Sequence, residues 1–187
     1  MQNNLQQLYK RALDLRSPWL NRWDSAKRYT MPTSDEDLAT LYDATASDAT
    51  DNLAASIYTL LTPPESMWLE LVRESELSPD AEYATRVLRA HLNDSNFYTT
   101  IHQCYMDLVV LGTACLFMGQ NPIGASSAFN FTAIPMSDIA ILPNAVFHTT
   151  SMTAREVMEK YPTWTPPANI RESVTQDPEM QLKLVQS

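Results

Sequence analysis

The chain is poor in glycine, with only Gly112, Gly119 and Gly124 among 187 residues. A phosphate-binding loop needs several closely spaced glycines, so neither a P-loop nor a dinucleotide-binding fingerprint can form. Cysteine is scarcer still, because Cys104 and Cys115 are too few for a disulfide scaffold and lack the spacing of metal ligands. These absences argue against nucleotide-dependent enzymes. They predict that both cysteines are small buried residues in a reducing cytoplasm.

Long apolar runs are missing as well. No stretch approaches the roughly 20 apolar residues of a membrane-spanning helix, and the N-terminal residues do not form a signal-peptide core. Hydrophobic residues still make up 44% of the chain, which is enough for a folded core at this length. The composition therefore predicts a folded, soluble protein that is not exported and has no membrane partner.

The net charge of −9 is distributed unevenly. Residues 1–30 carry six basic and two acidic residues, whereas residues 31–82 carry twelve acidic residues and a single basic one, Arg73. Proteins that wrap nucleic acid use Lys and Arg to displace counterions from phosphates. This charge balance opposes tight DNA binding, although it allows duplex DNA to pass without specific binding.

Helical periodicity dominates the first 111 residues. Apolar residues recur every three or four positions from Leu5 to Ala26, which predicts an amphipathic helix. Because Ser17-Pro18 is also a good helix start, this segment is either two helices, at about 3–15 and 18–30, or one bent helix. The same periodicity, with capping and stop signals, predicts four more helices. They span residues 47–61, ended by Pro63 and Pro64; 79–93; 97–111, ended by Gly112; and 154–161, capped by Thr153.

Some faces of these helices can also be anticipated. In the helix at 47–61, Leu53, Ala54, Ile57, Leu60 and Leu61 share one face. The helix at 79–93 is expected to bury another set of residues. These are Tyr83 or Ala84, together with Val87, Leu88, His91 and Leu92.

Strand patterns are short. Alternation over residues 67–72 predicts a strand that carries a buried Trp68. Apolar stretches at 113–118, 128–134, 138–142 and 146–150, separated by proline-containing turns, predict a small antiparallel sheet in the second half. Residues 162–187 are proline-rich and are expected to form an extended or partly disordered tail. The predicted fold class is α+β and mainly helical.

The residue pattern gives no catalytic, metal or cofactor site. None of the three histidines has a partner four residues away on a helix, and His102 and Cys104 should point to different sides of theirs. The acidic group Asp35, Glu36 and Asp37 lacks the glycine and spacing of a calcium loop, so it is interpreted as solvated charge.

Two tryptophans lie beside basic residues near the N-terminus. Aromatic rings interleaved with basic residues can stack on single-stranded nucleic acid. Trp19 and Trp23 both lie on the apolar stripe, however, which favours packing in the core or at a subunit interface.

Several blocks of sequence together resemble one family. The blocks are RWDSAKRYTMP near the N-terminus, LYDATASDATDNLAASIYTLLTPPESMWLEL (41–71), SNFYTTIHQCYMDLVVLGTACLFM (95–118), and FTAIPMSDIAI followed by TTSMTAREVMEKY within 131–161. In this order they are similar to the head-to-tail connector, or portal, proteins of short-tailed bacteriophages (podovirus type). The resemblance covers residues 1–161, which it implies form the N-terminal, wing-side region of a portal.

The resemblance implies structural roles for individual residues. Leu53, Ala54 and Ala55 would pack inside the subunit, and the Thr62-Pro63-Pro64 turn would lead to the strand with Trp68. A helix would start at Ser95-Asn96-Phe97 and end at Gly112-Thr113-Ala114. The residues expected to serve the scaffold or an interface are Trp19, Trp23, Trp68, Pro63, Pro64, Phe97 and Gly112.

The resemblance also implies a function. Portals are non-enzymatic virion proteins that form rings, usually dodecamers, at one capsid vertex, where DNA is packaged and ejected. Their partners are further copies of themselves, the capsid, the terminase and the tail, and they assemble in the bacterial host cytoplasm. Since family members usually run longer, this chain is expected to correspond to the N-terminal half, with a second portal fragment as a further partner.

Two alternatives remain open from the sequence. One is a separate capsid or tail adaptor that binds the portal. The other, from the enzyme class, is a small hydrolase with a carboxylate or cysteine site.

Overall fold

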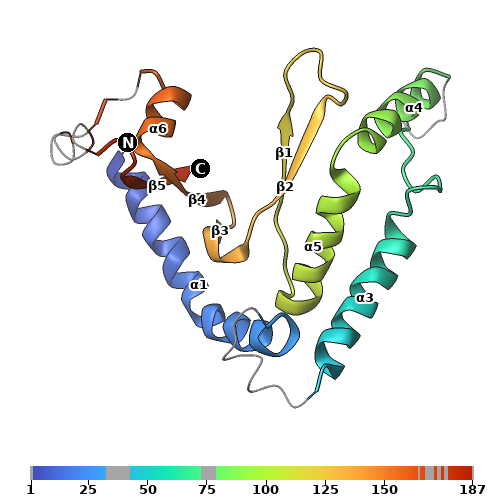
Figure 1. The fold of residues 1–187 in the computed structure, drawn as a ribbon, viewed down its shortest axis with the longest axis horizontal. Coiled ribbons are helices and arrows are strands. Elements are labelled where there is room, and N and C mark those ends of the chain that lie inside the picture. The colour runs from blue at the N-terminus through green and yellow to red at the C-terminus, as the bar shows by residue number, and fades with distance from the viewer. Residues whose placement is uncertain are drawn as a thin grey trace. The chain divides into compact units, whose positions relative to one another are not determined.

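The computed structural model describes residues 2–32, 43–72, 79–163, 165–166, 171, 174 and 177–186. The chain divides into two compact units: Met1–Arg16 with Ser137–Ser187, and Ser17–Met136 (Figure 1). Helix α1 (Gln2–Thr30) contributes to both units and contains Pro18, so the structure has one helix where the sequence allowed one or two. The described residues form helices and two small antiparallel sheets, which confirms the α+β class.

Helix α5 (Phe97–Leu111) is the centre of the second unit. It is contacted by α3 (Thr45–Leu61), by α4 (Pro79–Asn93) and by the hairpin of β1 (Leu116–Gln120) and β2 (Phe129–Ala133). Figure 1 shows α5 between the hairpin and α3. The bounds predicted for α4 and α5 are confirmed, and α3 starts two residues earlier than expected.

Each end of α5 is fixed by one residue, Gly112 at its end and Asn96 at its start. Gly112 follows the helix with φ +75°, the left-handed conformation that glycine adopts without a Cβ penalty, and its N–H donates to the Leu108 carbonyl. At the other end, Asn96 does not cap the helix with its side chain. Its amide donates to the Phe131 carbonyl (2.7 Å) and accepts from the Phe131 N–H (2.8 Å). Asn96 therefore ties the start of α5 to strand β2.

The core of the second unit is built around aromatic rings. Leu92, Phe97 and Phe131 are buried together, and the two phenylalanine rings meet edge to face at 5.1 Å. Trp68 and Leu69 pack on the border of this cluster.

The prediction of a strand at residues 67–72 is wrong. The described segment 67–72 has no regular secondary structure and pairs with no strand among the described residues. Trp68 and Leu69 are neighbours and both half-buried, so the alternation of a strand is lost. The Leu71 N–H donates instead to the Thr85 hydroxyl on α4 (2.9 Å).

This contact also explains a correction on α4. Its buried residues are Ala81, Thr85 and Leu92, whereas Tyr83 and Val87 are exposed, and so is Ala84. Thr85 can be buried because its hydroxyl also donates to the Ala81 carbonyl, which leaves no unpaired polar group. Of the predicted face, Leu92 is buried and Leu88 and His91 are half-buried.

The first unit holds a second antiparallel sheet in the order β3 (Ile139–Leu142), β4 (Ala145–Thr153), β5 (Gln181–Gln186). Its core contains Ala140, Leu142 and Phe147 against Ala12 of α1. The sequence had placed all strands in one sheet. Instead, the 3-10 helix η1 (Met136–Asp138) separates β2 from β3, and each of the two sheets lies within its own unit.

The C-terminal region of the first unit is held by a helix cap and by β5. In α6 (Ala154–Lys160), the Thr153 hydroxyl accepts from the Glu156 N–H and the Glu156 carboxylate accepts from the Thr153 N–H. These hydrogen bonds lower the pKa of Glu156. The predicted cap is confirmed, and the helix ends one residue earlier than expected. Residues 181–186 of the expected tail are paired with β4.

Asn96→Ala tests the link between α5 and β2. The substitution removes two hydrogen bonds and leaves the Phe131 backbone groups without their partner, so we expect a loss of about 1–2 kcal/mol in the free energy of unfolding. Denaturant titration measures it, with Asn93→Ala at an exposed position of α4 as the control. Equal stability of the two variants would contradict the role of Asn96.

Candidate assembly surfaces

Helix α3 packs on α5 through small side chains. Thr50 and Ala54 are buried, and the half-buried Tyr58 ring meets the His102 ring of α5 edge to face at 5.5 Å. The distance between packed helices depends on the side chains at the contact, so small residues permit a close approach. The Thr50 hydroxyl donates to the Ala46 carbonyl and adds no unpaired polar group to the contact.

Leu53 and Leu60 of α3, unlike Thr50 and Ala54, are exposed. Positions three and four residues apart form a second row along the helix, here called the outer stripe: Ala46, Ala49, Leu53, Ser56 and Leu60. All five are exposed, with Leu53 at 52% and Leu60 at 80% of full exposure. The stripe contains no charged residue. Asp48 and Asp51 are exposed elsewhere on the helix.

This arrangement corrects the sequence interpretation of α3. Leu53, Ala54 and Ala55 were expected to pack inside the subunit, but only Ala54 is buried. The face expected to unite Leu53 and Ala54 is divided, since the contact with α5 takes the small residue and leaves the large one outside. Exposed apolar rows of this kind are typical of interaction surfaces.

The two tryptophans of α1 have different environments. Trp23 is half-buried, and its indole N–H donates to the Leu111 carbonyl at the end of α5 (3.2 Å). Trp19 is 51% exposed, with the Arg22 guanidinium 5.2 Å from its ring centroid. Trp23 thus contributes to the core beside Gly112, while Trp19 is available at the surface.

Trp68 and Phe97, which are 29 positions apart, are brought together. Their rings stack at 5.7 Å with an interplanar angle of 9°, and the Trp68 indole N–H lies 3.4 Å from the Tyr98 hydroxyl. Trp68 is half-buried rather than fully buried as the strand pattern suggested. The ring nevertheless joins the segment after α3 to the start of α5.

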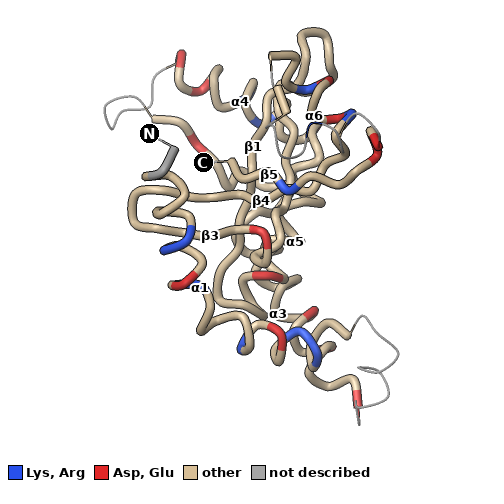
Figure 2. The backbone as a smooth tube through the Cα atoms, turned by 90° about the vertical axis from the view of Figure 1, so that its left-hand side faces the viewer, with Lys and Arg blue, Asp and Glu red and all other residues tan. Residues whose placement is uncertain are grey.

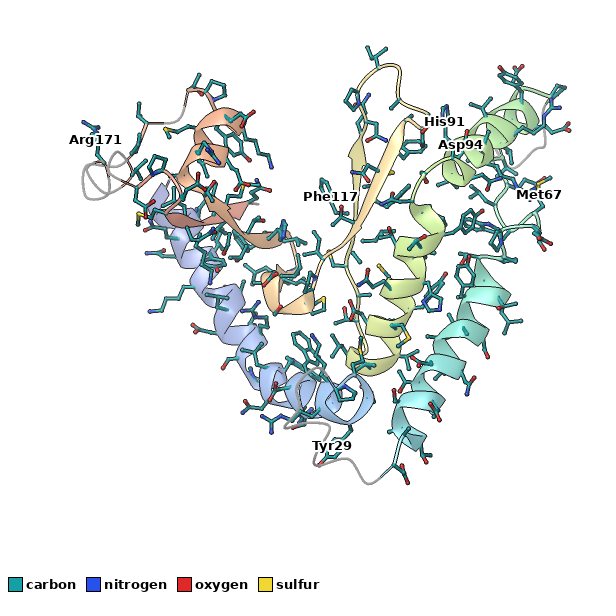
Figure 3. The ribbon with its side chains drawn as sticks, viewed as in Figure 1. Tyr29, Met67, His91, Asp94, Phe117 and Arg171 are labelled. Atoms are coloured by element: carbon teal, nitrogen blue, oxygen red, sulfur yellow. The ribbon has the colours of Figure 1, made fainter. Side chains whose placement is uncertain are left out.

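The turn before Trp68 is held in place by α4. After Pro63 and Pro64 end α3, the Ser66 N–H donates to the Pro63 carbonyl (3.3 Å). Arg89 of α4 donates to the Pro64 carbonyl (3.3 Å) and lies 3.9 Å from the sulfur of Met67, which is labelled in Figure 3. Pro63 and Pro64 therefore belong to a turn whose carbonyls accept hydrogen bonds from Ser66 and from Arg89 of α4.

Reactive side chains are dispersed or used in packing. His102 contacts Tyr58 of α3, whereas the Cys104 thiol lies 3.9 Å from the Cys115 carbonyl, so the two point to different sides of α5 as predicted. Burial raises the pKa of Cys104, with the nearby Asp107 adding to the effect. A thiol held protonated is a poor nucleophile. Cys104 is buried as expected, and Cys115 is half-buried.

The described residues offer neither a metal site nor a membrane-spanning helix. No group of three His, Cys, Asp or Glu side chains within the described ranges could hold a metal ion. The acidic residues Asp35, Glu36 and Asp37 lie outside the described residues. In the part of the chain that the structure describes, no helix is both long enough and apolar enough to cross a membrane.

The family model for bacteriophage head to tail connecting proteins matches residues 2–187. The chain belongs to this family. A search of curated protein sequences gives no match.

Membership confirms the family resemblance seen in the sequence. The chain has the role of a phage head-to-tail connector, it is a component of the virion, and it interacts with other phage head and tail proteins. The exposed side chains on α3 and α1 of this connector chain are candidates for those interactions.

The tryptophan stack of the connector can be tested by substitution. Trp68→Ala should lower the free energy of unfolding by about 2 kcal/mol, which is less than the 3–5 kcal/mol typical of a fully buried ring because Trp68 is half-buried. Trp68→Phe, which keeps a ring on Phe97, should recover most of the loss in the same denaturant titration. Equal effects of Ala and Phe would show that the stack contributes nothing.

Asp107 on α5 gives a prediction of pH dependence. Burial raises its pKa above the usual range, while the Lys27 ammonium opposes the shift. A raised carboxyl pKa means that the folded state binds the proton more tightly, so the stability contributed by the protonated form is lost as pH rises through the folded pKa. Asp107→Asn should therefore raise the melting temperature at pH 7 and leave it nearly unchanged near pH 3. A loss at pH 7 would show that the Lys27 attraction dominates.

Proposed function

We propose that the chain is a subunit of a portal ring at one vertex of the phage capsid, through which DNA is packaged and ejected. Its family membership establishes the connector role, and the portal ring is the more specific form of it. In this proposal residues 1–161 form the wing-side region, and residues 162–187 are the proline-rich tail that follows it, with residues 181–186 paired to β4.

The outer stripe of α3 is the observation that carries the proposal. A monomeric protein gains stability by burying leucine, yet Leu53 and Leu60 are left in solvent while Thr50 and Ala54 are the buried residues of the helix. A row of apolar residues without charge is suited to contact with another protein surface. A ring of identical subunits provides such a surface on every copy.

The charge of the chain supports passage of DNA rather than binding. Figure 2 shows Lys and Arg in short, separate positions along the described chain, interspersed with Asp and Glu. The net charge of −9 opposes the displacement of counterions from phosphates on which tight DNA binding depends. Duplex DNA in the ring is therefore expected to move without specific contacts to this chain.

The proposal assigns a set of partners and no reaction. Copies of the chain form the ring, with a second portal fragment completing it, and the capsid, terminase and tail contact it in the virion. Assembly takes place in the bacterial cytoplasm. The raised thiol pKa of Cys104, and its orientation to the side of α5 away from His102, support a structural rather than a catalytic role.

Mass measurement of the purified chain, alone and co-expressed with the adjacent phage genes, tests the proposal. We expect assemblies that contain many copies of the 21.1 kDa chain and closed rings in electron micrographs. A chain that stays monomeric and binds singly to a preformed portal would instead indicate a separate adaptor.

A further inference from the structure

The assembly surface on α3 has a matching partner on the same unit. This inference rests on the proposed self-association of the chain. A ring formed by rotation joins two different patches, one on each side of the subunit. The outer stripe supplies one patch, so the subunit needs a second, different patch to receive it.

The β1–β2 hairpin carries such a patch. In its register Met118 pairs with Phe131, while Phe117 pairs with Thr132 and Gly119 with Asn130. Phe131 is buried beside Phe97 of α5, and alternate residues of a strand point to opposite faces, so Phe117 lies on the face turned away from α5. Figure 3 shows Phe117 on that side of β1. Its ring is 57% exposed, and no charged residue occurs between Leu108 and Ser137.

Helix α5 separates this patch from the outer stripe. His102 contacts Tyr58 of α3, and Cys104, about 200° further round the helix, contacts the carbonyl of Cys115 just before β1. The α3 and β1 sides of α5 are therefore opposite. Both patches belong to the second unit, so their separation does not depend on the first unit.

The two patches also fit in shape and polarity. Leu53 and Leu60 are seven residues apart on α3, about 10.5 Å, with Ser56 between them. Ser56 leaves room for a ring between the leucines, and its hydroxyl already donates to the Asn52 carbonyl (2.7 Å). Covering it would leave no unpaired donor. On the hairpin, Gly119 and Thr132 beside Phe117 are small enough to let the ring project.

We propose that Phe117 of one copy docks over Ser56, between Leu53 and Leu60, of the next copy in the ring. A charged partner surface is disfavoured at either patch, because burying an unpaired charge costs free energy. The contact is directional, from β1 to α3, so it propagates from copy to copy and closes only when the ring is complete.

Two single substitutions and their mixture test this pairing. Leu53→Asp disables the α3 patch and Phe117→Asp disables the β1 patch, and each variant alone should be monomeric in analytical ultracentrifugation where the wild-type chain assembles. Mixed in equal amounts, they should form a dimer and nothing larger, because one intact patch remains on each partner. Ala55→Asp and Gln120→Glu, at exposed positions off the two patches, are the matched controls and should assemble like the wild type.

The outcomes separate this pairing from the proposed function. If the wild-type chain assembles but either variant still does so, or the mixture stays monomeric, the pairing is overturned and the ring stands. A wild-type chain that self-associates neither alone nor when co-expressed with the adjacent phage genes overturns both. Circular dichroism checks folding of each variant, and Leu60→Asp, at a more exposed position, replaces Leu53→Asp if the latter unfolds.

Discussion

The close contact of α3 with α5 is the constraint on which the second unit depends. Thr50 and Ala54 fill it, and the half-buried Tyr58 completes it against His102. Packing on small residues brings the two helices near each other and leaves the larger aliphatic side chains of α3 without an internal partner. One contact thus fixes the position of α3 and exposes Leu53 and Leu60 at the same time.

Helix α5 connects α3 to the other elements of the unit. Its start is held by the Phe97 ring cluster and by the Asn96 amide on β2, and its end by Gly112 and the indole of Trp23. Groups that could support chemistry, such as Cys104 and His102, are occupied in these contacts. A connector functions through its contacts with other head and tail proteins, and in this unit α5 is the element on which α3, α4 and the β1–β2 hairpin pack.

The accuracy of the sequence predictions follows the range of the interactions involved. The bounds of α4 and α5 were predicted correctly because their limits are local, set by Pro79, by the polar residues after Leu92 and by Gly112. The strand at 67–72 failed because a strand exists only with a partner, and the Leu71 N–H bonds to a threonine side chain instead. The third strand of the second sheet could not be predicted either, since the pairing of β4 with β5 joins residues far apart in the chain.

The family, the α+β class and most helices were therefore determined by the sequence alone, through motif order, apolar periodicity and local capping residues such as Thr153. Which face of α3 is inside was decided only by the tertiary structure. Periodicity identifies an apolar face but not what it packs against, and the contact with α5 buries Ala54 and leaves Leu53 outside. The same holds for the candidate surfaces, because exposure is a property of the whole packed unit and not of the residue.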